Sequence, residues 1–181
     1  MSKTWQIDPS HSQVSFSIKH MMVATVRGNF SRFKTELHFN PENLLETRVR
    51  AEIDTASIDT RDEKRDEHLR SADFFHVDQF PKMTFVSKRM EHRGDNEYLL
   101  VGDLTIIGVT REVELEVEYN GTNTNPWGVQ CAGFSATASI DRTDFGMTWN
   151  AELETGGLLV AKAVKLQLDI EAALQDAPVL A

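Results

Sequence analysis

His11 is the first histidine along the chain, a residue type that suits acid–base or ligand chemistry, and it lies in the segment DPSHS. Ser10 and Ser12 flank it, so a nucleophile stands beside a potential base. Neighbouring residues of an extended chain point to opposite faces, however, which disfavours a working Ser–His pair. Asp, Pro and Ser are turn-forming residues. A hydrogen-bonding role within a turn is therefore the favoured interpretation of His11, over a base or a metal ligand.

Four potential metal ligands follow within a short span: Asp66, His68, His76 and Asp78. Their spacing matches neither the HExxH pattern nor a Cys/His zinc pattern. A solvated helix face explains them better, so no metal site is predicted.

Asp141, Arg142 and Asp144 form a third polar cluster, at the end of an expected strand. Local ion pairs that brace a turn are the favoured interpretation. A role in holding the polar head of a ligand is the alternative. The sequence contains no P-loop, GxGxxG or GxSxG motif, so no residue is assigned a catalytic role.

Strands must position these polar residues, because most of the chain alternates apolar and polar side chains. The clearest strand, at 112–119, alternates four glutamates with Val113, Leu115, Val117 and Tyr119. The glutamates should face water, since burying unpaired carboxylates is prohibitive. Similar patterns predict strands at 5–7, 14–18, 28–39, 49–53, 83–90, 98–107, 129–140 and 164–170. Within 28–39, Phe30 and Phe33 are out of phase, which predicts a β-bulge near Ser31 and Arg32.

One segment, at about 60–80, breaks the strand pattern and favours a helix. Thr60 followed by Glu63 is a capping-box pattern, and a short surface helix is expected over 62–69. The apolar residues after it supply an anchor, chiefly Phe74, Phe75 and Phe80. We interpret the segment as a lid or plug across a sheet.

Length and composition limit the class of protein. The chain has 181 residues, 40% of them hydrophobic, which suits a single all-β domain over residues 1–181. The net charge of −9 argues against nucleic acid and against anionic lipid headgroups. No apolar run is long enough to insert across a membrane. The single cysteine and the absence of a visible signal peptide predict a cytoplasmic protein, or a periplasmic one if the sequence is a processed form.

About eight antiparallel strands with one apolar face each can form a sandwich or a closed barrel. The small residues Ala132, Ala136 and Ala138 share one face of a strand and would leave volume unfilled. Periodicity alone leaves a filled core and an apolar cavity equally open.

Several segments together resemble the YceI family of polyisoprenoid-binding, lipocalin-like proteins. They are WQIDPSHSQVSFSIKHMMVATVRGNFSRF, SIDTRDEKRDEHLRSADFFHVDQFPKMTF, GDLTIIGVTREVELEVEY, NPWGVQCAGFSATASIDRTDFGMTW and VAKAVKLQLDIEAAL. The resemblance covers about residues 4–174. One departure is Ile107, where many members of the family have His, so no polar role is expected at that position.

The resemblance implies an extended eight-stranded antiparallel β-barrel, lipocalin-like, with one short helical insertion packed against it. It also implies a hydrophobic tunnel that holds a long isoprenoid lipid, such as a polyprenyl phosphate or an isoprenoid quinone, for transport or storage and in some settings a stress response. No reaction and no cofactor beyond this lipid are expected. A homodimer is a further possibility.

The phase of the strands, combined with this resemblance, predicts which residues line the tunnel. They are Phe16, Ile18, Phe30, Phe33, Met83, Phe85, Leu104, Ile106, Val117, Phe134, Ala136, Ala138, Phe145 and Trp149. Candidate contacts to the head group are His11, Arg142 and Asp144. Two alternatives stay open: an enzyme acting on a bound lipid or quinone, with His11 or Asp144 as its acid or base, and a structural β module with a filled core.

Overall fold

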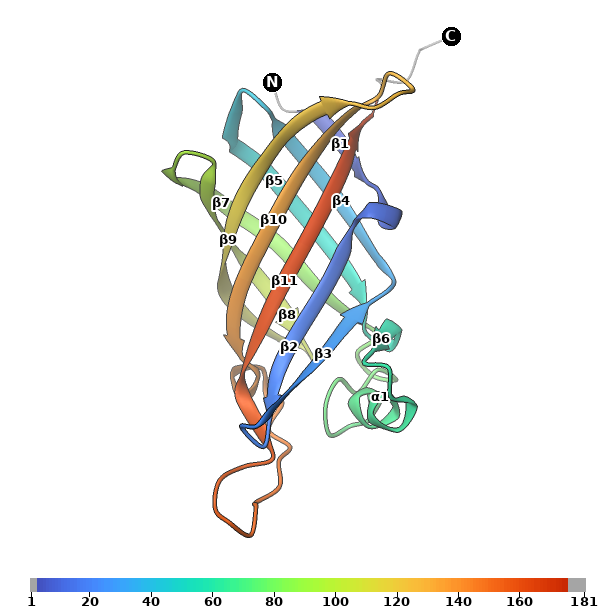
Figure 1. The fold of residues 1–181 in the computed structure, drawn as a ribbon, viewed down its shortest axis with the longest axis vertical. Helices are drawn as coiled ribbons and strands as arrows, with labels where there is room; N and C mark the ends of the chain where they lie inside the picture. The colour runs from blue at the N-terminus through green and yellow to red at the C-terminus, as the bar shows by residue number, and fades with distance from the viewer. Residues whose placement is uncertain (1–2, 176–181) are drawn as a thin grey trace.

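The computed structural model describes residues 3–175, which leaves the first two and last six residues of the predicted domain outside the description. Almost all of the described chain is strand (Figure 1). The strands are β1 (Lys3–Ile7), β2 (Gln13–His20), β3 (Ala24–Phe30), β4 (Phe33–Asn40), β5 (Asn43–Asp54), β6 (Ile58–Asp59), β7 (Lys82–Gly94), β8 (Glu97–Ile106), β9 (Val109–Thr124), β10 (Gln130–Asp141) and β11 (Val160–Leu174). One α-helix, α1 (Glu63–Arg70), and three 3-10 turns, η1 (Pro9–His11), η2 (Thr55–Ser57) and η3 (Arg142–Phe145), complete the elements described.

The strands close into a barrel in the order β1-β4-β5-β7-β8-β9-β10-β11, and β1 pairs with β11 to complete the ring. Trp5 of β1 lies opposite Leu37 of β4 on one side and Leu174 of β11 on the other. Every pairing is antiparallel, which confirms the predicted eight-stranded barrel with a short helix. β2 and β3 continue β1 and β4 beyond breaks in those strands, and they pair with each other.

The predicted strand over 28–39 is broken rather than bulged. Phe30 ends β3 opposite Val14 of β2, whereas Phe33 begins β4 opposite Ile53 of β5. The backbone between them pairs with the η2 turn instead of a strand: Ser57 Oγ accepts from Arg32 N, and the Ser57 carbonyl accepts from Ser31 N. The phase shift at Ser31 and Arg32 therefore marks a point where the chain changes partners.

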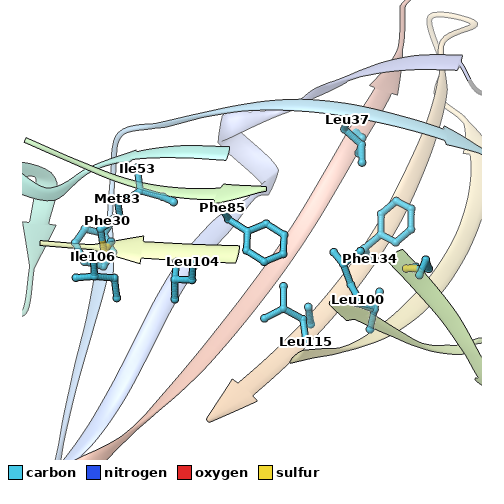
Figure 2. Packing of buried hydrophobic residues seen from close by; sticks show 14 of the residues in the cluster. Phe30, Leu37, Ile53, Met83, Phe85, Leu100, Leu104, Ile106, Leu115 and Phe134 are labelled. Atoms are coloured by element: carbon cyan, nitrogen blue, oxygen red, sulfur yellow. The ribbon is translucent and has the colours of Figure 1, made fainter. Parts of the chain in front are cut away.

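Strand β9 follows the predicted phase. Glu112, Glu114, Glu116 and Glu118 are exposed, and Leu115 and Val117 are buried. This register prediction is confirmed. It places one apolar face of β9 inside the barrel, where Figure 2 shows Leu115 near Leu100 and Phe134.

Helix α1 begins one residue later than the expected helix, and its N-cap is Asp62. The Asp62 side chain accepts a hydrogen bond from Arg65 N at 3.1 Å, so the capping box predicted from Thr60 is wrong. Thr60 is buried instead, and its N and Oγ1 donate to Asp66 Oδ1 at 2.9 and 2.6 Å. Asp66 is 6% exposed, so its interpretation as part of a solvated helix face is also wrong. The sequence pattern predicted the helix but not the buried hydrogen bonds between Thr60 and Asp66.

Aromatic packing closes one end of the barrel, where β1 begins and β11 ends. The Trp5 and Phe39 rings stack at 4.2 Å between centroids, and Phe39 meets Phe134 edge to face at 5.1 Å. Trp5 Nε1 donates to the Phe39 carbonyl at 3.3 Å, which satisfies the indole in a dry site. Trp5 and Phe39 are essentially inaccessible to solvent. We refer to this end as the closed end.

Candidate ligand-binding cavity

The interior of the barrel holds a cavity of about 640 Å³, within the range of small-molecule sites. Its wall comes from the inward faces of almost every strand and is nearly all aliphatic or aromatic (Figure 2). Trp5 and Phe39 are not part of this wall, because they pack above it at the closed end. The cavity therefore extends from that plug toward the opposite end of the barrel.

All the predicted tunnel residues except Ala138 lie along this wall. Ala138 follows Ala136 in the inward phase and packs against the core, but it borders a second hollow rather than the cavity. The β9–β10 pairing ends at Thr137 and Glu116, so β10 runs on past Ala138 without β9 as its neighbour. Inward-phase residues that the prediction left out also belong to the wall, including Leu37, Val49, Met90, Leu100, Leu115, Leu168 and Ile170. The alternation of apolar and polar residues along their strands was the signal that could have identified these wall residues.

The segment with α1 covers the side of the cavity away from the closed end. Phe74 is 6% exposed, and its ring lies 5.4 Å from that of Trp149. His68 packs edge to face on Trp149 at 4.6 Å and on Phe74 at 5.0 Å, while its Nε2 lies 2.8 Å from Asp73 Oδ2. All three aromatic side chains line the cavity. The predicted lid is thus an aromatic cluster shared by α1, the loop after it and the segment after η3.

Polar residues border the cavity where it reaches the surface. Lys19 and His20 from the end of β2, and Lys64 and Arg65 from α1, belong to its lining, and Lys19 and Lys64 are exposed. Asp62 lies with them. We call this region the mouth. The sequence prediction missed these residues, because Lys19 and His20 end a strand and the other three stand among further charged residues, so none of them forms a motif.

Arg142 lines the cavity, but its guanidinium donates hydrogen bonds to main-chain carbonyl groups. Nε donates to Ala161 at 2.8 Å, Nη1 donates to Met147 and Trp149 at 2.7 and 2.9 Å, and Nη2 donates to Val160 at 3.3 Å. Arg142 is 4% exposed, and burial lowers the pKa of its guanidinium. These bonds tie η3 to the start of β11. The geometry supports a bracing role for Arg142, through main-chain carbonyls rather than the predicted ion pairs with Asp141 and Asp144, and it leaves little donor capacity for a head group.

The other two candidate head-group contacts lie outside the cavity wall. Asp144 is exposed in η3, where its main-chain carbonyl accepts from Arg111 Nε at 3.1 Å. His11 is exposed in η1, and its Nδ1 lies 2.8 Å from Asp8 Oδ2 and 4.0 Å from Glu171 Oε1. The ligand atoms of Asp8, His11 and Glu171 lie within 4.8 Å of one another, so these residues could hold a divalent ion. Their mutual hydrogen bonds also account for the cluster as the predicted turn brace.

Asp8 offers a direct test of this turn. Its pKa is lowered from 3.8 to about 2, first by the hydrogen bond from Ser10 and then by the bond from His11. Both bonds favour the carboxylate over the neutral acid. Ser10→Ala should therefore raise the pKa of Asp8 toward 3.8, and His11→Ala should raise it less, as read from the carboxyl carbon shift in an NMR titration. An Asp8 pKa that stays near 2 in Ser10→Ala would contradict the hydrogen-bonded turn.

The potential metal ligands of the α1 segment do not converge. Asp66 binds Thr60, His68 binds Asp73, and Asp78 is exposed beyond the helix. His76 packs against the Phe80 ring at 6.0 Å between centroids. Among the described residues, these four side chains are therefore not brought together.

A closed eight-stranded barrel with a short helix and an apolar interior defines a lipocalin-like class of protein. A model of the YceI-like domain matches residues 5–172, so the chain belongs to the YceI-like family. A UPF0312 protein of Staphylococcus epidermidis is 41% identical over 173 residues, which are 95% of this chain and 98% of the relative.

Solved structures share the fold. BcnA of Burkholderia cenocepacia superposes with a TM-score of 0.78 at 26% identity, covering 91% of this chain and 98% of BcnA. The YCEI protein of Campylobacter jejuni gives 0.75 at 30% identity, covering 87% and 90%. A polyisoprenoid-binding domain from Saccharophagus degradans gives 0.69 at 11% identity, covering 96% and 99%, and at that identity it shows the fold alone.

The described residues contain no helix that is long and apolar enough to cross a membrane. The expected lack of nucleic-acid partners, the possible homodimer and the cytoplasmic location stay predictions from the sequence.

Proposed function

We propose that the chain binds one long isoprenoid lipid in the barrel, with its apolar tail lengthwise in the cavity and its head group at the mouth. The observation that carries this proposal is the apolar cavity of about 640 Å³, closed at one end by Trp5 and Phe39. Apolar cavities exclude water and accept apolar guests. A guest gains about 0.8 kcal/mol for each CH₂ group that it buries, so a long tail binds tightly without polar contacts.

The mouth suits a lipid with a polar or charged end. Lys64 is exposed there and available to a phosphate, as in a polyprenyl phosphate, and Lys19 keeps donor capacity beside its one bond to Thr25 Oγ1. Arg65 adds positive charge, but its Nε and Nη2 already donate to Thr60. His20 could donate a hydrogen bond to a quinone carbonyl. The Saccharophagus degradans domain, whose name states polyisoprenoid binding, supports this class of ligand through the shared fold. Transport or storage of the lipid is the role that such a site serves.

Binding rather than catalysis is favoured by the positions of the candidate catalytic groups. His11 and Asp144, the residues that an enzyme would use, lie outside the cavity wall, and their side chains do not face a bound tail. A filled structural core is disfavoured by the cavity itself.

Solvent extraction of the purified protein, followed by mass spectrometry, tests the proposal. We expect about one isoprenoid lipid per chain, and its mass would distinguish a phosphate from a quinone. Protein that carries no lipid and takes up none when incubated with polyprenyl phosphate or ubiquinone would overturn it.

A further inference from the structure

The end of the barrel opposite the closed end carries exposed apolar side chains. Met22 and Val23, in the turn between β2 and β3, are 75% and 82% exposed, and Met21 is 43% exposed. Leu158, in the loop before β11, is 43% exposed. The Met21 N–H donates to the Leu159 carbonyl at 2.8 Å, so the loop lies against the turn. We call Met21, Met22, Val23 and Leu158 the apolar tip.

The backbone of this turn is strained in a way that its sequence does not relieve. Met21 and Met22 have φ angles of 54° and 59°, and Val23 N donates to the His20 carbonyl at 3.1 Å. Two central residues with positive φ form the hairpin turn that Asn-Gly adopts with little strain. Two methionines adopt it only at a conformational cost. Backbone strain that neither the residue type nor a nearby contact offsets is typical of functional sites.

The apolar tip is continuous with the mouth of the cavity. Lys19 and His20 immediately precede it and line the cavity, and Leu159 and Val160 follow Leu158 and also line it. A lipid that leaves the cavity here meets the apolar tip before it meets bulk water. Since a long isoprenoid is insoluble, its source and its destination must be membranes.

The charges around the apolar tip differ from those of the whole chain. The chain has a net charge of −9, yet β2, the turn and β3 (13–30) contain no Asp or Glu, and they carry Lys19 next to the turn and Arg27 in β3. Glu152 and Glu154 lie in the facing loop and offset part of this charge. The apolar side chains, rather than charge, should therefore dominate contact with a phospholipid surface.

We propose that the apolar tip docks on the surface of a phospholipid bilayer, with Met22 and Val23 inserted at the boundary between headgroups and acyl chains, so that lipid can pass between membrane and cavity. The purpose of this docking rests on the proposed function, but the docking itself does not require a lipid in the cavity. Apolar side chains on a folded surface bind bilayers in proportion to the area they bury.

Co-sedimentation with phosphatidylcholine vesicles tests the docking. The parent protein should sediment with the vesicles, with little change between low and high salt. The double variant Met22→Ser, Val23→Ser should lose affinity by about tenfold or more, because it removes two inserted apolar side chains. Both positions are exposed, so folding should survive, and circular dichroism checks it.

Trp127→Ser is the matched control. Trp127 is 84% exposed, in the loop between β9 and β10 at the other end of the barrel, and its removal should leave vesicle binding unchanged. No sedimentation of the parent, or an equal loss in the control, would overturn the docking. A change in oligomeric state of the double variant, seen by analytical ultracentrifugation without a change in vesicle binding, would assign the apolar tip to self-association instead.

The two proposals fail separately. A parent protein that yields no lipid on extraction but sediments with vesicles contradicts lipid storage and supports docking. A parent protein that carries lipid but does not sediment supports the proposed function and contradicts docking.

Discussion

Ala136→Trp is expected to purify with several-fold less lipid than the parent protein. Ala136 is 8% exposed, lines the cavity and lies between Val117 of β9 and Leu168 of β11. An indole at this position must project into the cavity and occupy the path of the tail. Overpacking a filled core costs typically about 1–3 kcal/mol, but here the ring can enter volume that the ligand vacates. Lipid per mole of folded protein, by extraction and mass spectrometry, measures the effect.

Thr137→Trp is the control for this variant. Thr137 is the next residue of β10, is exposed and points to the outer face of the barrel, so the same ring placed there should leave the lipid content unchanged. Ala138 is unsuitable as the test position because it lies outside the cavity wall, and unsuitable as a control because it packs against the core. An Ala136→Trp protein that folds and carries as much lipid as the parent would show that the tail lies elsewhere.

Arg142→Leu should lower the free energy of unfolding by about 3–5 kcal/mol, because breaking a buried polar network is one of the changes that cause large losses of stability. The buried guanidinium donates to the carbonyls of Met147, Trp149, Val160 and Ala161, and leucine would remove all of these bonds. The Val160 carbonyl would keep the hydrogen bond from Asn150 Nδ2 at 2.7 Å. Each hydrogen bond to a charged group contributes about 1.5–3 kcal/mol, and partial access of water reduces the total. Urea denaturation followed by fluorescence measures the change.

Two comparisons make this result specific. Arg111→Leu removes one bond from an exposed arginine to the Asp144 carbonyl, and it should cost less than about 1 kcal/mol. The loss of unfolding free energy in Arg142→Lys should lie between those of Arg142→Leu and Arg111→Leu. One ammonium group cannot reach four carbonyls that are arranged around a planar guanidinium. Losses of similar, small size in all three variants would show that the segment from η3 to β11 does not depend on this arginine.

The sequence by itself determined which residues form strands and which face of each strand is apolar. In β9 the alternation of glutamates with Leu115 and Val117 needs no tertiary information, because the pleat sends successive side chains to opposite faces. The same local rule identified part of the cavity wall. It also located an irregularity at Ser31 and Arg32, which it predicted as a bulge and which the structure shows as a break between β3 and β4.

Only the tertiary structure decided which segments the backbone pairs with at that position. The backbone of Ser31 and Arg32 pairs with Ser57, a residue remote in sequence, so the pattern showed an irregularity without showing that the strand changes neighbours. The cap of α1 was missed for a similar reason. Thr60 had the residue type for a cap, but the buried Asp66 carboxylate binds it, and burial is not visible in a helix of polar residues.

The tertiary structure also decided whether the barrel is filled. Alternation is a property of each strand alone, whereas the volume between facing strands depends on the ring that all of them form together. Packing at the closed end joins Trp5, Phe39 and Phe134 from three strands, and the apolar wall below them encloses about 640 Å³. The same closure gave Arg142 its carbonyl partners and left Met22 and Val23 exposed beside the mouth. Local sequence determines the faces of the strands, and only closure of the ring determines which faces meet and what space is left between them.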